Sequence, residues 1–417
     1  KLKGKRIKEM KKFWDKWTEI ALVKRILVGL ILGAILGIAV PQATGIAILG
    51  DVFVSALKAI APLLVFFLVI SSLCNAGKSH GGVIKTVIIL YMFSTVLAAV
   101  IAVFASMAFP VKMTLANAAT DTSAPQGIVE VLNNLLLNVV ANPVSSLVNA
   151  NYVGILMWAV LLGLAFRAAD KMTKKVLADV ADGISMVVTW IINLAPFGIF
   201  GLVFNTVSTN GLDIFTTYGK LLLLLVGCML FIYFVTNPLL VYWCIRQNPY
   251  PLIFHCLKRS ALTAFFTRSS AANIPVNMKV CEEMGLDRDT YSVTIPLGAT
   301  INMDGAAITI TVMTMATAFT LGIHVDIPTA IILSLLAALS ACGASGVAGG
   351  SLLLIPMACS LFGISDDISM QVVAVGFIIG VVQDSVETAL NSSSDLLLSA
   401  SAEFRQWRLE GKEIKFK

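Results

Sequence analysis

Long apolar runs separated by short polar stretches dominate the chain. A helix needs about 20 apolar residues to cross a hydrocarbon layer about 30 Å thick, and eight runs approach or exceed that length. They cover residues 26–40, 53–73, 86–109, 152–168, 184–207, 221–245, 291–321 and 371–402. The pattern predicts an all-α polytopic membrane protein with eight transmembrane helices.

Two further apolar runs, residues 251–278 and 327–362, carry small and polar residues at their centres. These centres read TRSSAANIP at 267–275 and ACGASGVAGGS at 341–351. Non-helical backbone at membrane depth is tolerated where it is buried or lines a cavity. We therefore expect two re-entrant helical hairpins, the alternative being a small-residue surface for helix packing.

The distribution of Lys and Arg predicts the orientation. If the N-terminus lies inside and both hairpins are re-entrant, 26 of the 30 basic residues lie on the inner side. If each hairpin run instead crossed the membrane once, 24 basic residues would lie on the inner side. The positive-inside rule therefore mildly favours re-entrant hairpins over single crossings. It predicts that both termini lie on the cytoplasmic side of a bacterial inner (plasma) membrane. The first apolar run lacks a clear cleavage site, so we expect no cleavable signal peptide.

Composition narrows the function. The chain is 58% hydrophobic and 13% charged, about half the charged fraction of soluble domains. Its net charge of +6 is concentrated in a basic segment, residues 1–22, which indicates either a headgroup-binding amphipathic helix or a solvated tail and not nucleic-acid binding. The seven Cys and three His residues show no metal-ligand spacing, so we expect neither disulfides nor a cofactor.

Polar residues that a membrane should not contain without a reason lie in the last two runs. Residues 300–305 (TINMDG) predict a break in the seventh helix. The eighth run carries a polar stripe about 100° wide at 3.6 residues per turn: Asp384, Glu387, Thr388, Asn391 and Asp395. An intramembrane carboxylate costs at least ~2.5 kcal/mol, and Arg268 is the one basic residue in these central segments. Unpaired acids beside amides and hydroxyls are typical of hard-cation sites such as sodium sites.

The two halves of this region repeat weakly. Each has a small-residue hairpin ending in Ile-Pro (274–275 and 355–356), followed by an Asn (302, 391) and an Asp (304, 395). Internal repeats of interrupted helices are typical of secondary transporters.

Two other classes compete with a carrier. Asp304 and Asp384 could form the proton-sharing dyad of an intramembrane aspartyl protease, but a GxGD-type motif is absent from the sequence and the hairpins would have no purpose. A passive channel is the other alternative, but a pair of hairpins acting as an outer and an inner gate fits a carrier better. We therefore predict a carrier and not an enzyme.

The segments TRSSAANIP, NMDGAA, ASGVAGGSLLLIP and DSVETALNSSSD resemble the glutamate/neutral amino acid transporter family, the dicarboxylate/amino acid:cation symporters. The similarity extends over residues 22–403. It implies an elevator-type homotrimer with a scaffold (23–75 and 127–216) and a moving transport domain (76–126 and 217–403). Residues 1–22 and the charged tail 404–417 lie outside both.

The resemblance also implies the site residues. It assigns the substrate ammonium to Asp384, the α-carboxylate to Asn391 and hairpin one, and a supporting role to the Arg268 backbone. The expected substrate contacts are Ser269, Ser270, Val347, Asp384, Glu387, Thr388 and Asn391. Three sodium sets are expected: Gly298, Asn302, Asn391 and Asp395; Thr300, Met303, Ala341, Cys342 and Ala344; and Tyr91, Ser94, Thr95, Asn302 and Asp304.

Two positions depart from members that carry glutamate. Glu387 stands where those members have an Arg, and Ala306 where they have a Thr. The resemblance therefore implies sodium-coupled import of L-serine and L-threonine, with acidic amino acids or dicarboxylates as the alternative. An ionised Glu387 would repel a second carboxylate and accept a substrate hydroxyl; alternatively, it is protonated and shares a proton with Asp384.

Overall fold

The computed structural model describes residues 20, 22–75, 82–115, 136–137, 140–212, 214–342 and 349–414. Within these residues the chain is helical and contains no strand. The helices are α2 (Leu22–Ala39), α3 (Ala47–Asn75), α4 (Gly82–Ala108), α6 (Pro143–Val148), α7 (Tyr152–Ala165), α8 (Lys171–Asn193), α9 (Ala195–Asn210), α10 (Ile214–Phe231), α11 (Asn237–Ile245), α12 (Tyr250–Cys256), α13 (Leu262–Thr267), α14 (Ser270–Glu283), α15 (Arg288–Ile301), α16 (Asp304–Thr320), α17 (Ile327–Ala341), α18 (Ile355–Ser360) and α19 (Asp366–Leu409). Single π-helical turns join α10 to α11 and α12 to α13.

Several of these helices are long and apolar enough to cross a membrane. Six such segments occur among the described residues: Thr44–Asn75, Gly82–Ala108, Lys171–Asn193, Ile214–Ile245, Arg288–Thr320 and Asp366–Leu409. The protein is therefore a multi-pass membrane protein. The count of eight spans and two hairpins stays a prediction, because α7 and α9 are shorter apolar helices and α2 is not among the six segments.

The apolar run 184–207 is not one helix, and our prediction was wrong there. α8 runs from Lys171 to Asn193. Asp170 caps its N-terminus, because the Asp170 side chain accepts a hydrogen bond from the Thr173 amide. α9 begins at Ala195 with Pro196 in its first turn. Proline has no N–H for the preceding turn and is favoured at helix starts, so the chain breaks at this point.

Hairpin one, formed by α12, α13 and α14, turns back at Arg268 and Ser269. Arg268 adopts the left-handed conformation (φ 52°) that ends α13, and Ser269 Oγ accepts from the Ala272 amide to start α14. The two arms contact each other, and both pack on α19. This is the shape expected of a re-entrant hairpin.

Hairpin two consists of α17 and α18, which contact each other and α16. Its tip, residues 343–348, lies outside the described residues. A short 3₁₀ turn, Leu352–Leu354, leads from the tip into α18.

The predicted break in the seventh run is confirmed. α15 ends at Ile301 and α16 begins at Asp304, so Asn302 and Met303 are non-helical. The Met303 amide donates to Thr95 Oγ1 of α4 at 3.2 Å, which satisfies one of the groups freed by the break. Both sides of the break pack against the long helix α19.

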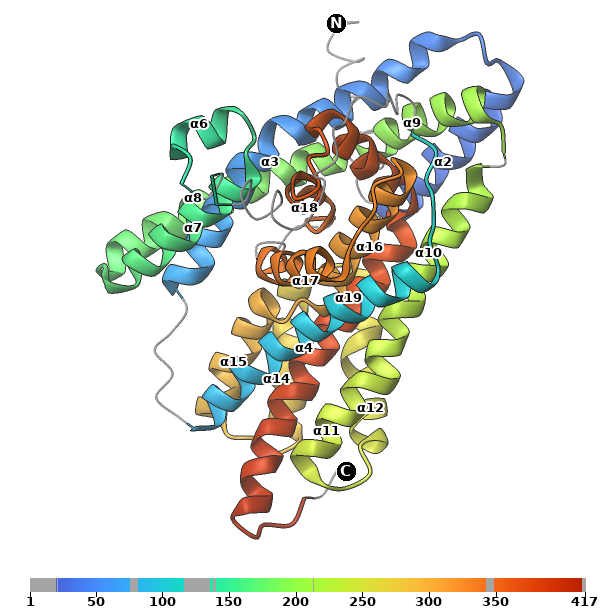
Figure 1. Cartoon of the computed structure of the whole chain (residues 1–417). Helices are drawn as coiled ribbons and strands as arrows, with labels where there is room; N and C mark the ends of the chain where they lie inside the picture. Colours follow the sequence, from blue (N-terminus) through green and yellow to red (C-terminus); the bar gives the residue numbers. More distant parts are fainter. Residues whose placement is uncertain are drawn as a thin grey trace, which may run out of the picture.

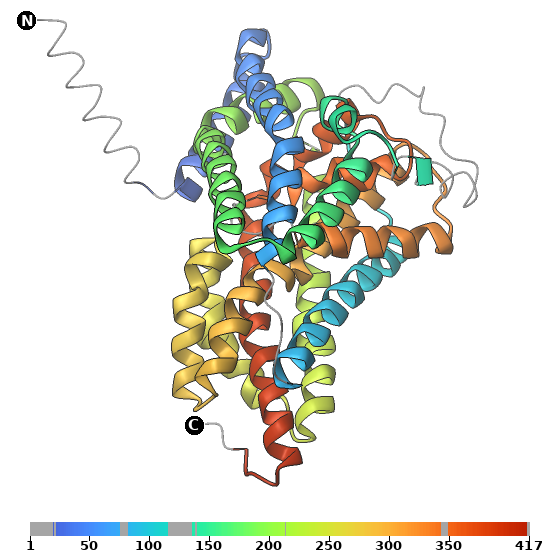
Figure 2. The same ribbon diagram turned by 90° about the vertical axis from the view of Figure 1, so that its left-hand side faces the viewer.

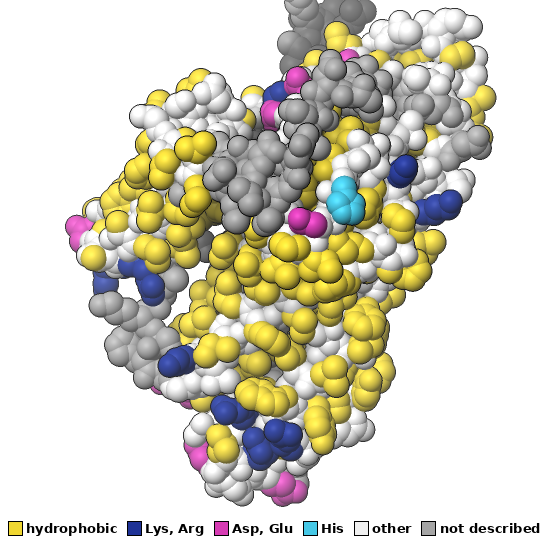
Figure 3. Space-filling model, in the orientation of Figure 1, with side chains coloured by type: hydrophobic (Ala, Val, Ile, Leu, Met, Phe, Trp, Pro, Cys, Tyr) yellow, Lys and Arg dark blue, Asp and Glu magenta, His cyan; other side chains and the backbone are white. Residues whose placement is uncertain are grey.

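The helices form two groups. α2, α3, α7, α8 and α9 pack on one another, whereas α4 and the helices from α10 to α19 form a second bundle around α16 and α19. Figures 1 and 2 show the blue and green helices of the first group beside the later bundle, which runs from yellow-green α10 to red α19. The light-blue α4 joins this later bundle. In Figure 3 apolar side chains cover much of the visible face, and Lys and Arg side chains lie at its lower end, along its left side and at the upper right.

The backbones of α2 and α9 touch. A Cβ added at Gly29 would lie 2.2 Å from the Pro196 carbonyl oxygen, and one at Gly33 2.6 Å from that of Phe200. Gly37 continues the spacing of four residues, with the Phe204 carbonyl oxygen at 3.0 Å. This glycine seam lets two helices pack more closely than side chains would allow.

Candidate substrate and cation site

The polar stripe predicted on the eighth run is buried. Asp384, Glu387, Thr388, Asn391 and Asp395 are each at most 6% exposed and all belong to α19. Their side chains meet residues of hairpin one, of hairpin two and of the α15–α16 break. A helix that carries this many polar groups into the protein interior needs partners for each of them.

Asp384 is ion-paired, which corrects our expectation of an unpaired acid. Arg268 Nη2 and Nε each lie 2.6 Å from Asp384 Oδ2, and the Gly349 amide donates to Oδ1 at 3.3 Å. The pairing arises because the left-handed turn at Arg268 brings the hairpin tip against α19. Asp384 therefore joins the tip of hairpin one to the described edge of hairpin two.

Glu387 accepts several hydrogen bonds through one oxygen. Its Oε2 accepts from Thr309 Oγ1 at 2.7 Å, from Ser351 Oγ at 2.9 Å and from Gln383 Nε2. Gln383 Nε2 also donates to Thr309 Oγ1 at 2.8 Å. Sequence reasoning missed Thr309, Ser351 and Gln383. Gln383, polar and directly before Asp384 in an apolar run, was the available signal.

The side chains of Thr388 and Asn391 form hydrogen bonds within the protein. Thr388 Oγ1 donates to the Asp384 carbonyl oxygen of its own helix at 2.8 Å. Asn391 Oδ1 accepts from the Gly305 amide at 2.7 Å, and its Nδ2 lies 3.4 Å from Met303 Sδ. Asn391 thus ties α19 to the start of α16.

An amide network holds hairpin one behind its tip. Asn273 Nδ2 donates to Ser392 Oγ at 2.8 Å, and Asn277 Nδ2 donates to the Ser392 carbonyl oxygen at 2.8 Å. Ser270, the first residue of α14, is buried, and Ser269 caps that helix. The expected contact Val347 lies outside the described residues.

The first cation set is brought together around Asp395. Asn302 Nδ2 donates to Asp395 Oδ1 at 2.9 Å, and a Cβ at Gly298 would lie 2.8 Å from the same oxygen. Asn302 Oδ1 is buried without a hydrogen-bond partner among the described residues. A carboxylate beside an unused amide oxygen suits a hard cation. Asn391, the fourth member, is expected to contribute its backbone carbonyl oxygen, which accepts from Ser394 Oγ at 2.9 Å.

The third set divides. Ser94 Oγ donates to Asp304 Oδ2 at 2.7 Å, and Thr95 Oγ1 donates to Oδ1 at 3.2 Å. Tyr91 lies with the first set, because its hydroxyl donates to the Asp395 carbonyl oxygen at 2.8 Å and lies 2.7 Å from Ser399 Oγ. Tyr91 therefore connects α4 to α19 at Asp395.

The second set lies where hairpin two meets the end of α15. Cys342 Sγ lies 3.8 Å from the Ile301 carbonyl oxygen, and Ala341 and Met303 are buried. Thr300 Oγ1 donates to the Leu297 carbonyl oxygen at 2.7 Å, and Ala344 is outside the described residues. The described residues contain no cluster of three His, Cys, Asp or Glu side chains, so a cation here would depend on amide, hydroxyl and backbone oxygens.

Comparison with known proteins places these features in a family. Residues 22–403 match the model of the sodium:dicarboxylate symporter family. The chain is 57% identical over 412 residues to the serine/threonine transporter SstT of Bifidobacterium adolescentis, covering 99% of this chain and 96% of the relative. Proteins of the same name from Streptococcus thermophilus (55% over 400 residues, 96% and 100% covered) and Streptococcus agalactiae (57% over 395 residues, 94% and 98% covered) are also similar.

Proposed function

The chain belongs to the sodium:dicarboxylate symporter family, and we propose that it imports L-serine and L-threonine by sodium symport with alternating access. The family consists of transporters and not enzymes, and sodium is its coupling ion. The relatives that share more than half of their residues with this chain carry the name serine/threonine transporter.

The observation that carries this proposal is the setting of Glu387. Its Oε2 is already surrounded by the hydroxyls of Thr309 and Ser351, the chemical group that serine and threonine also present. In its ionised form, this buried carboxylate disfavours a second carboxylate by like-charge repulsion. Acidic substrates would need a cation, and Arg268 is already paired with Asp384.

The substrate's charged groups would bind around hairpin one. Asp384 Oδ1, opposite the oxygen held by Arg268, receives the ammonium group. The first turn of α14 at Ser269 and Ser270 presents backbone N–H groups and the positive end of the helix dipole to the α-carboxylate. Asn391, Thr388 and the tip residue Val347 complete the site.

Sodium, the co-transported substrate, would bind at the three sets around the α15–α16 break. Asp395 with Asn302 and Gly298 forms the first, and Asp304 with Ser94 and Thr95 forms another. The third uses Thr300, Met303 and, from hairpin two, Ala341, Cys342 and Ala344. Asn391, a substrate contact, also bonds to the start of α16. Cations that order the α15–α16 break would therefore also order Asn391, which couples sodium binding to substrate binding.

The two helix groups suggest how the protein moves. The transport domain comprises residues 76–126 and 217–403, and the scaffold comprises 23–75 and 127–216 and forms a homotrimer. An ion pair between Lys58 of α3 and Asp366 at the start of α19 (3.1 Å) lies across this division. Both termini lie on the cytoplasmic side of a bacterial plasma membrane.

Uptake by proteoliposomes tests the proposal. Initial rates for radiolabelled serine, threonine, alanine and aspartate are measured with an inward sodium gradient, and with potassium replacing sodium. Sodium-dependent serine and threonine uptake that excess aspartate does not inhibit supports it. Serine uptake that is equal without sodium would overturn the symport, and preferred aspartate uptake would favour the acidic alternative.

A further inference from the structure

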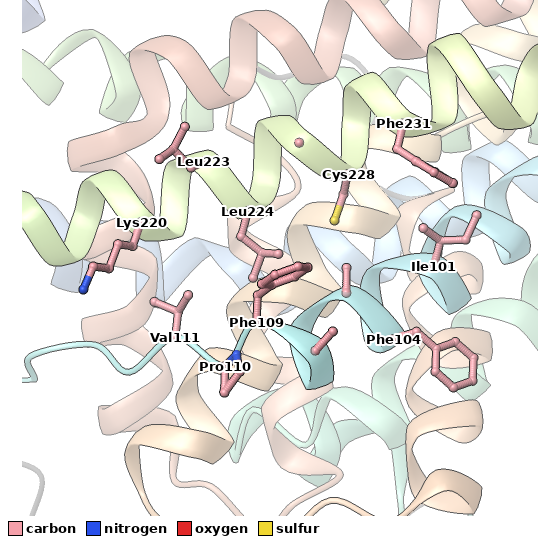
Figure 4. Close-up of a pocket in the computed structure, with 13 residues that line it drawn as sticks. Ile101, Phe104, Phe109, Pro110, Val111, Lys220, Leu223, Leu224, Cys228 and Phe231 are labelled. Atoms are coloured by element: carbon pink, nitrogen blue, oxygen red, sulfur yellow. The ribbon is translucent and has the colours of Figure 1, made fainter.

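A groove of about 870 Å³ runs between the end of α4 and α10, outside the site described above. Figure 4 shows Lys220 and Val111 at one end, Phe231 and Phe104 at the other, and the Phe109 ring between the two helices. Apart from Lys220, its lining side chains are apolar. The groove therefore offers almost nothing to a polar substrate.

The groove opens to the exterior of the protein. Leu223 is 74% exposed and Phe109 69% exposed, and both line it. A Cβ at Gly227 of α10 would meet no atom within 4 Å. Both helices belong to segments that are apolar enough to span a membrane, so the medium that fills this groove is lipid.

The length of the groove and its one cationic side chain, Lys220, indicate which kind of lipid it would bind. Lys220 and Phe231 are eleven positions apart on α10, a rise of about 16 Å, or roughly half of a 30 Å hydrocarbon layer. Lys220 is exposed and forms no ion pair with the described acidic residues. One acyl chain that starts at a headgroup beside Lys220 would reach the bilayer midplane at Phe231.

We propose that this groove is a binding site for an anionic phospholipid, whose phosphate pairs with Lys220 and whose acyl chain lies along α4 and α10 past Gly227. The bound lipid braces α4, the helix that carries Ser94 and Thr95, against α10. The inference concerns a second ligand and does not depend on which amino acid is transported.

Native mass spectrometry of the delipidated full-length protein tests this, with phosphatidylglycerol, phosphatidylcholine of the same chains, or oleate added. Gly227→Leu fills the groove. Gly219→Leu is the matched control, because Gly219 is on the same helix, has open space at its Cβ and does not line the groove. Lys220→Gln removes the cation and keeps the side chain. Thermal stabilisation by sodium and serine verifies that each variant is folded.

We expect wild type and Gly219→Leu to retain phosphatidylglycerol, Gly227→Leu to lose it, and Lys220→Gln to retain about fivefold less, the effect of one basic residue on an anionic lipid. Equal retention by Gly227→Leu and Gly219→Leu would overturn the site. Equal retention of phosphatidylcholine, or an unaffected Lys220→Gln, would overturn the anionic headgroup. Oleate that outcompetes phosphatidylglycerol would identify a free fatty acid as the occupant.

Discussion

Ser351 donates a hydrogen bond to Glu387, with Oγ 2.9 Å from Oε2. This bond ties the second arm of hairpin two to the middle of α19. A hydroxymethyl group of the protein thus occupies the acceptor that we assign to the hydroxyl of a serine or threonine substrate. Binding would then exchange one hydroxyl for another at Glu387.

If Glu387 is ionised in the loaded site, Glu387→Gln should weaken serine and threonine binding about tenfold or more, because a hydrogen bond to a charged acceptor is worth ~1.5–3 kcal/mol. Alanine has no hydroxyl to lose and should weaken much less. Isothermal titration of serine and alanine in saturating sodium measures both. Ser351→Ala is the companion variant, since it removes the competing hydroxyl and should leave serine binding unchanged or tighter. An equal loss for serine and alanine in Glu387→Gln would refute the hydroxyl assignment.

Asp395→Ala should raise the sodium concentration for half-maximal uptake by about tenfold, equivalent to ~1.4 kcal/mol. The change removes the carboxylate and leaves Asn302 Nδ2 with one remaining partner among the described residues, Ser394 Oγ at 2.8 Å. Initial rates of serine uptake over a sodium series check this. Asp326→Ala is a useful control, because this acid caps α17 through the Thr329 amide and does not belong to the sodium sets. The same sodium dependence in Asp395→Ala and wild type would remove Asp395 from the site.

Gly298→Ala should impair sodium binding without altering any charge. The added methyl would lie 2.8 Å from both Asp395 Oδ1 and the Tyr91 hydroxyl, so one of these buried groups must shift, and such overpacking costs ~1–3 kcal/mol. Sodium-dependent thermal stabilisation measures the effect. Gly219→Ala, with open space at its Cβ, should behave as wild type. If Gly298→Ala keeps full stabilisation by sodium, the Asp395 region does not hold the cation.

A cross-link between α3 and α19 should stop transport while leaving binding intact. Lys58 and Asp366 are 40% and 25% exposed, so Cys substitutions at both positions are open to a bifunctional thiol reagent that replaces the lysine chain. If α3 is scaffold and α19 is mobile, uptake should fall at least about tenfold and return when a cleavable linker is reduced. Each single Cys variant serves as a control. Undiminished uptake by fully cross-linked protein would mean that the two helices move together.

Much of the site could be predicted because polar residues in an apolar run are costly and therefore informative. The 100° stripe on α19 and the break at Asn302 and Met303 both follow from residue type and spacing along one helix. Hairpin one was recognisable for the same reason, since its polar centre would not be stable as a continuous span.

Partners across helices could not be predicted in this way. The Arg268–Asp384 pair depends on the direction in which a left-handed turn aims one side chain. The location of Tyr91 beside Asp395 depends on how α4 crosses α19. Thr309 is one of several threonines on the apolar helix α16, and only the packing of α16 against α19 brings its hydroxyl to Glu387. Helical periodicity gives the face of a residue and not the residue that it meets.

The glycine seam between α2 and α9 constrains how the protein is made. α2 is the first described helix to leave the ribosome, but Pro196 and Phe200, whose carbonyl oxygens approach Gly29 and Gly33, are synthesised only when about half of the chain is complete. The contact between α2 and α9 can therefore form only after α9 has been synthesised, so the packing of the first helix group is completed late in chain synthesis.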